Sequence, residues 1–137
     1  MVPIDISYLG GLRCKAVHGP SGQSIITDAP TDNHGKGEFF SPTDLVAAAL
    51  GSCVATVMGI VAERDGIDLT GMCIHVEKEM AAQPLRRLGR VTIRLMMPAG
   101  LTKEQQHKLE LTAASCPVVK SLSEQVEVPI EFLWPNA

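Results

Sequence analysis

Four cysteines are the residues of this sequence best suited to chemistry: Cys14, Cys53, Cys73 and Cys116. Thiolates act as nucleophiles, redox groups and metal ligands, and in a reducing compartment free thiols are more common than structural disulfides. No Cys-x-x-Cys or His-x-x-x-His spacing occurs, so we expect no metal site. Phosphate-binding loops and dinucleotide fingerprints are also absent, and we therefore expect no cofactor.

Cys53 lies in "SPTDLVAAALGSCVATVMGIVAERDG", a stretch with the pattern of one long helix. Ser41 suits the N-cap, Asp44 follows it at the capping-box spacing, and Gly66 can close the helix in a left-handed conformation. Gly51 beside Cys53 indicates that another segment or a ligand comes close at mid-helix. Taken alone, Cys53 fits either a small buried hydrophobic residue or a functional thiol.

Cys116 stands directly before Pro117, at the expected start of a short helix. The partial positive charge of a helix N-terminus favours thiolate, so position alone predicts Cys116 to be the more acidic thiol of the pair with Cys53. The alternative is an inert capping residue. Cys14 and Cys73 fall in predicted strands, where a half-buried structural position is the simpler interpretation.

The remaining pattern predicts strands on both sides of the long helix. Period-two alternation and turn residues indicate strands, and capping signals indicate two further helices, starting at Thr102 and Pro117. The expected strands are Ile4 to Tyr8, Leu12 to Val17, Ser24 to Thr27, Met72 to Val76, Val91 to Met97 and Val126 to Trp134. We therefore expect one α+β domain over residues 1–137, with a largely antiparallel sheet packed on a long central helix.

Composition and charge narrow the possible partners and compartment. The formal net charge of -3 and the pI near 5.8 argue against nucleic-acid binding. The N-terminus lacks the features of a signal peptide, so we expect a cytoplasmic protein. The segment from Leu45 to Ala62 carries no charge, but its Ala, Gly, Ser and Thr content argues against a membrane span. A helix apolar on all sides is better explained as a central helix, covered in part by a second subunit.

Three segments together carry a resemblance to a known family. "SPTDLVAAALGSC" followed by "CPVVKSL", with "GGLRC" near the start, resembles the OsmC/Ohr family, the osmotically induced and organic hydroperoxide resistance proteins. The resemblance implies an OsmC-like fold and an intertwined homodimer with two active sites at the subunit interface. It also implies a thiol-dependent peroxidase that reduces organic hydroperoxides and is regenerated by a dithiol reductant.

Carried onto this sequence, the resemblance makes Cys53 the nucleophile, Cys116 the resolving thiol and Arg13 the cation that holds the thiolate. Thr43 stands where the peroxidase members have Glu, and the acid, Asp44, comes one residue later. Asp44 is thus either the active-site acid or a helix cap. Two other interpretations remain: a non-catalytic OsmC-like protein that binds a hydrophobic ligand or senses oxidants, and a purely structural protein with inert thiols.

Overall fold

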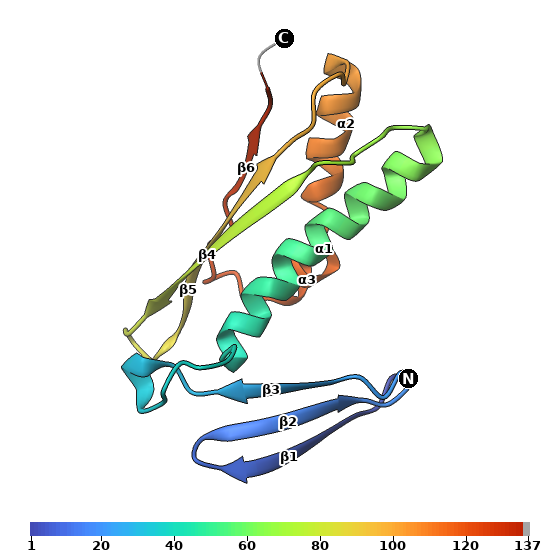
Figure 1. Ribbon diagram of the computed structural model, residues 1–137. Coiled ribbons are helices and arrows are strands. Elements are labelled where there is room, and N and C mark those ends of the chain that lie inside the picture. Colours follow the sequence, from blue (N-terminus) through green and yellow to red (C-terminus); the bar gives the residue numbers. More distant parts are fainter. Residues whose placement is uncertain (136–137) are drawn as a thin grey trace. The chain divides into compact units, whose positions relative to one another are not determined.

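The computed structural model describes residues 1–135, which fall into two compact units, Met1–Val46 and the chain from Ala47 onward. Each unit holds one three-stranded sheet, with the strands in the orders β1-β2-β3 and β4-β5-β6. Figure 1 shows the elements of both units. The α+β class and the expected order of strands and helices are confirmed.

The first unit is an antiparallel meander of β1 (Ile4–Gly10), β2 (Arg13–His18) and β3 (Ser24–Asp28). A loop with a short 3-10 helix, Thr31–Asn33, follows the third strand. Strand alternation places Ile4, Ile6 and Tyr8 on one face, and their side chains are 59%, 67% and 66% exposed. One face of this sheet is therefore apolar and uncovered by the unit itself.

The long helix α1 (Pro42–Asp65) begins at the end of the first unit and continues into the second. It is followed by β4 (Cys73–Ala81), β5 (Arg87–Met96), α2 (Lys103–Ala113), α3 (Pro117–Ser121) and β6 (Ile130–Leu133). Strands β4 and β5 form an antiparallel hairpin, whereas β6 pairs with β5 in parallel. The parallel pairing arises because α2 and α3 form a crossover that returns the chain to the start of β5.

The core of the second unit lies between the helices and one face of the sheet. Leu50, Val54 and Met58 of α1 are fully buried, as are alternate residues of β5 and the inner side of α2. Figure 1 shows α1 running alongside this sheet. The members of the core are Ala47, Leu50, Val54, Met58, Val91, Ile93, Leu95, Met97, Leu109, Ala113 and Cys116.

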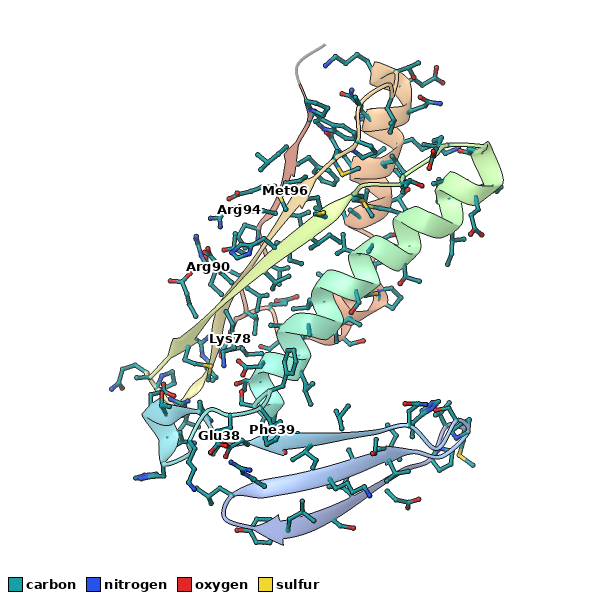
Figure 2. All side chains as sticks on the ribbon, in the orientation of Figure 1. Glu38, Phe39, Lys78, Arg90, Arg94 and Met96 are labelled. Atoms are coloured by element: carbon teal, nitrogen blue, oxygen red, sulfur yellow. The ribbon has the colours of Figure 1, made fainter. Side chains whose placement is uncertain are left out.

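The opposite face of this sheet is charged. Arg94 of β5 bonds Glu77 of β4 at 3.0 Å and Glu131 of β6 at 2.8 Å, so one guanidinium spans all three strands. Arg90 bonds Glu127 at 2.7 Å, and Figure 2 shows both arginines on this face. Cross-strand ion pairs on one face and aliphatic residues on the other explain the period-two alternation of the sequence.

Helix α1 is long and apolar enough to cross a membrane, with a hydropathy of 2.2. Length and composition do not separate such a span from the central helix of a packed domain. The packing of Leu50, Val54 and Met58 against β5 and α2 agrees with the second interpretation.

Candidate functional site

Asp44 caps the start of α1. The backbone N–H of Ser41 donates to Asp44 Oδ2 at 2.9 Å, and the backbone N–H of Asp44 donates to Ser41 Oγ at 3.1 Å. These reciprocal bonds form a capping box, as Ser41 and its spacing to Asp44 indicate in the sequence. The hydroxyl of Thr43 also lies 3.2 Å from that of Ser41. Both Thr43 and Asp44 thus take part in hydrogen bonds at the start of α1.

Arg13 lies in the first unit, where two carboxylates surround it. Its guanidinium Nη2 is 2.9 Å from Glu38 Oε1 and 3.4 Å from Asp28 Oδ2. The Arg13 Cζ atom also lies 5.0 Å from the centre of the Phe39 ring, close enough for a cation–π contact. Glu38 and Phe39 belong to the loop that precedes α1 (Figure 2). Arg13 is thus held by a cluster built from β2, β3 and this loop.

Asp28 is the buried member of the cluster, with a side chain 1% exposed. Its Oδ2 accepts a hydrogen bond of 3.1 Å from the Glu38 backbone N–H. This hydrogen bond, and then the charge of Arg13, hold the pKa of Asp28 below its usual value against the opposing effect of burial. Its Oδ1 is buried and has no partner among the described residues.

Sequence reasoning missed Asp28 and Glu38 as partners of Arg13. A signal for Asp28 existed, because the residue follows a predicted strand and pairs in register with Arg13 of β2. The expected strand ended one residue earlier, at Thr27, which placed Asp28 in the loop. Glu38 offered no comparable signal, because only the path of the loop brings it to the guanidinium.

Cys53 and Cys116 meet in the second unit. Cys53 packs against the core cluster that contains Cys116, and its thiol lies near enough to affect the pKa of Cys116, although 62 residues of chain stand between them. Cys116 is fully buried in the core, whereas Cys53, on α1, is only partly buried. Close packing of α1 on the sheet at Gly51 sets this arrangement, because a Cβ at Gly51 would lie 2.7 Å from Val76 Cγ2.

The environment of Cys116 overturns the expectation that it is the more acidic thiol. Burial, and then the neighbouring Cys53 thiol, raise the pKa of Cys116 above its usual value. The backbone N–H groups of Val119 and Val118 act in the opposite direction without reversing the shift. The prediction was wrong because α3 has a single turn, too short to offset the desolvation of a thiol placed in the core.

The other two cysteines belong to strands. Cys14 is half-buried in β2, in the first unit, and Cys73 is exposed at the start of β4. The thiol of Cys73 donates weakly to the Gly71 carbonyl at 3.7 Å. All four cysteines are free, and within residues 1–135 no three His, Cys, Asp or Glu residues gather as a metal site would require.

A hollow of about 330 Å³ lies along α1 and β4 in the second unit. Its lining is mainly apolar: Ala48, Gly51, Ser52, Ile74 and Val76. Cys53 is not among these lining residues, although it directly follows Ser52 in α1.

The OsmC-like protein family matches residues 35–131, which include α1, both cysteines of the pair and the first two residues of β6. No functionally curated protein matches the sequence. A solved structure of a candidate osmotic stress induced and detoxification response protein from Psychrobacter arcticus is 42% identical, covering 97% of this chain and 96% of that one, with a TM-score of 0.91.

More distant structures share the fold. An organic hydroperoxide resistance protein OsmC from Legionella pneumophila is 20% identical over 96% of each chain, with a TM-score of 0.78. An organic hydroperoxide resistance protein from Elizabethkingia anophelis is 16% identical, over 98% of this chain and 96% of that one, also with a TM-score of 0.78. The family match covers well over half of the sequence, and the chain belongs to the OsmC-like protein family.

Proposed function

We propose that this protein is a thiol-dependent peroxidase that reduces organic hydroperoxides through Cys53 and Cys116. The observation that carries the proposal is that the two thiols neighbour each other in the core of the second unit, one buried and one partly accessible. Two neighbouring thiols can form a disulfide where their Cα atoms come within about 4.4 to 6.8 Å of each other. The names of the relatives from Legionella pneumophila and Elizabethkingia anophelis support the substrate class.

In the proposed reaction the Cys53 thiolate attacks one oxygen of the peroxide, and the O–O bond breaks. The departing alkoxide takes a proton and leaves as an alcohol, and Cys53 becomes a sulfenic acid. The Cys116 sulfur then attacks the Cys53 sulfur, forming a disulfide, and the sulfenic hydroxyl leaves as water with the Cys116 proton. A dithiol reductant regenerates both thiols by exchange.

Arg13 and Asp44 take different roles in this proposal. Arg13 is proposed as the cation that favours the thiolate of Cys53 and orients the peroxide oxygens, as the resemblance implies. Asp44 acts mainly through the start of α1, because its carboxylate already accepts the Ser41 N–H in the capping box. The proposed reaction requires no cofactor or metal.

The proposal includes a homodimer in the cytoplasm. The exposed apolar face of the β1-β2-β3 sheet supports a second copy as its cover, because a three-stranded sheet cannot form a core with one apolar face open to water. Helix α1 also leaves Ala49, Ser52 and Ile60 exposed, a face of small and apolar side chains that a second helix can approach.

Single-turnover reaction of the reduced protein with cumene hydroperoxide, and separately with hydrogen peroxide, tests the activity. We expect one alcohol released per thiol pair and a Cys53–Cys116 disulfide in the peptide map. The organic peroxide should react faster, since each buried methylene of substrate contributes about 0.8 kcal/mol. A Cys53→Ser variant should release no alcohol, whereas Cys116→Ser should release one and stop at the sulfenic acid.

The second candidate function is an oxidant sensor or a binder of hydrophobic ligands without useful turnover. The hollow along α1 and β4 favours a ligand-binding role, because its mainly apolar lining suits a hydrophobic ligand. Reversible oxidation without catalytic turnover in the presence of excess dithiol would identify this alternative. Thiols that resist both peroxides would point to the purely structural interpretation.

A further inference from the structure

We infer that Asp28 is a positioning residue for Arg13, and that its buried carboxylate, more than the exposed carboxylate of Glu38, fixes where the guanidinium lies. The effect of this positioning on catalysis rests on the proposed function, in which Arg13 is the cation assigned to the Cys53 thiolate. The contacts that fix the guanidinium all lie within the first unit, Met1–Val46.

Strand pairing brings Arg13 and Asp28 side by side. Arg13 is the first residue of β2 and Asp28 the last residue of β3, and the two are direct partners in the antiparallel register. Side chains of directly opposed residues lie on the same face of a sheet, with Cβ atoms about 4.5 to 5.5 Å apart. The pairing of Arg13 with Asp28 is therefore set by the sheet and not by the path of a loop.

The two carboxylates that contact Arg13 differ in burial. The Asp28 side chain is 1% exposed, whereas that of Glu38 is 53% exposed. The contact with Glu38 is the shorter one, at 2.9 Å against 3.4 Å for Asp28. Water and salt weaken an ion pair at an exposed position, and a buried charge is screened much less. Asp28 is therefore the stronger determinant of the guanidinium position, despite its longer contact.

Asp28 is itself held in place and charged. Its backbone N–H donates to the Phe40 carbonyl at 3.2 Å, and its Oδ2 accepts from the Glu38 backbone N–H at 3.1 Å. That N–H of Glu38, and then the charge of Arg13, lower the pKa of Asp28 against the effect of burial. Arg13 thus faces a carboxylate that is ionised at neutral pH and tied to the loop before α1.

The guanidinium of Arg13 keeps donors available while it is held. Its Nη2 makes both ion pairs, and its Cζ lies 5.0 Å from the centre of the Phe39 ring. A planar guanidinium fixed at one nitrogen and over one ring has a defined orientation. Within residues 1–135, Nε and Nη1 of Arg13 have no hydrogen-bond acceptor. These donors are the ones that a thiolate or a peroxide oxygen can use.

The charge of Asp28 has an opposing effect on the reaction. Two carboxylates and one guanidinium give the cluster a net negative charge, which weakens the attraction of Arg13 for a thiolate. Misplacing a group that contacts the reacting atoms by about 1 Å can cost about a hundredfold in rate, however. Loss of position therefore outweighs loss of the negative charge, and removal of the Asp28 charge should slow the reaction.

Side-chain NMR of the full chain tests the position of Arg13 without any peroxide. The Nε–H signal of Arg13 is assigned by its loss in Arg13→Lys, and rotation of the guanidinium about Nε–Cζ is then measured. Asp28→Asn, whose amide oxygen still accepts the Glu38 N–H, should speed this rotation at least about tenfold, because a hydrogen bond to a charged group is lost. Glu38→Gln is the matched control and should speed it less than about threefold. Equal effects, or a larger effect of Glu38→Gln, would overturn the inference.

A salt titration of the unaltered chain repeats the test without a substitution. Raising sodium chloride to about 1 M shortens the Debye length to about 3 Å and screens exposed ion pairs. Rotation of the Arg13 guanidinium should speed up less than about threefold, because the contact with buried Asp28 persists. A tenfold or larger increase would show that the exposed Glu38 holds the guanidinium and would overturn the inference.

Stopped-flow oxidation by cumene hydroperoxide tests the consequence for catalysis. Asp28→Asn should slow the reaction by about threefold or more, and by no more than Arg13→Ala does. In the Arg13→Ala background the same change should alter the rate less than about twofold, because no guanidinium remains to be positioned. Asp5→Asn, at an exposed position of β1, is the control for loss of a carboxylate.

The outcomes separate this inference from the peroxidase proposal. A faster reaction of Asp28→Asn, or equal slowing with and without Arg13, would show that Asp28 does not act through the guanidinium and would overturn the inference. An unaltered chain that consumes no peroxide, or an Arg13→Ala variant that reacts at the full rate, would overturn the proposed role of Arg13. The NMR and salt measurements would then still decide whether Asp28 positions the guanidinium.

Discussion

Cys53 and Cys116 are the same residue type in different surroundings. For the acidity of the Cys116 thiol, these surroundings matter more than its position in the sequence. A helix N-terminus normally favours a thiolate, yet Cys116 lies in the core and its pKa is raised. Cys53 lies at the edge of the same core and keeps access to solvent. The pair thus combines a partly exposed thiol with a buried one.

Arg13 and Asp44 should differ in their effect on peroxide reactivity. Arg13→Ala removes the only cation assigned to the site and should slow oxidation of Cys53 by about tenfold or more. Asp44→Asn should change the rate less than about threefold, because an amide oxygen still accepts the Ser41 N–H. Stopped-flow consumption of cumene hydroperoxide gives both rates. Equal large losses with unchanged stability would instead place Asp44 among the reacting groups.

Asp28 should make the stability of the protein sensitive to acid. Its pKa is lowered in the folded state, so its contribution is present above its ordinary value of 3.8 and is lost as the pH falls below it. Urea unfolding at pH 6 and at pH 3 measures this effect. The free energy of unfolding should fall less between the two pH values for Asp28→Asn than for the unaltered chain. The same loss in both proteins would show that Asp28 does not contribute. Asp5→Asn, at an exposed position of β1, serves as the matched control.

At the scale of elements, α1 carries most of the site. Its capping box sets where the helix begins, its core face holds Leu50, Val54 and Met58, and its edge presents Cys53. Gly51 allows the helix to lie against β4, although glycine lowers the stability of an isolated helix. The close approach of Val76 thus explains why a glycine stands here, although it lowers the stability of the helix itself.

Gly51→Ala should destabilise the protein despite the higher helix propensity of alanine. The added Cβ would lie 2.7 Å from Val76 Cγ2, and a β-branched side chain has little freedom to move away. We expect a net loss of about 1 to 3 kcal/mol in the free energy of unfolding. Val76→Ala makes room, so the double variant should be less destabilised than the sum of the two single changes. Additive losses of stability would show that the contact with Val76 does not limit how closely α1 packs on β4.

At the scale of the whole molecule, the uncovered apolar surface is the main feature. Ile4, Ile6 and Tyr8 lie together on one face of the first sheet, and Ile25 joins them from β3 at 48% exposure. A hollow of about 200 Å³ on this face is lined by Ile4, Ala16, His18, Gln23 and Ile25. Removing these apolar side chains from water is favourable. A second copy of the chain that packs on this face would bury them, which supports the proposed dimer.

Sedimentation at micromolar concentration should therefore show a dimer. Ile6→Asp places a charge on the apolar face and should shift the protein toward monomer, since burying an unpaired carboxylate is costly. Ser7→Asp, on the opposite face of the same strand, is the matched control and should leave the dimer intact. A monomeric unaltered chain, or equal effects of the two variants, would contradict the proposed dimer surface.

Local patterns determined the elements of this protein. Alternation predicted the strands, capping residues predicted the starts of α1 and α2, and the paired cysteine motifs indicated the OsmC-like family, which the comparisons confirm. These features depend on neighbours within a few residues, and their physical causes are readable in the sequence. The single domain over residues 1–137 and the catalytic roles of Arg13, Asp44, Cys53 and Cys116 stay predictions.

Tertiary structure alone decided the environments of the functional groups. It brought Asp28 and Glu38 to Arg13, placed β6 parallel to β5, and buried Cys116 while leaving Cys53 partly exposed. The pKa of a thiol depends on its desolvation and on its hydrogen-bond partners, and both are set by segments far apart in the chain. That is why the position of Cys116 before Pro117 predicted an acidic thiol, whereas the folded core raises its pKa.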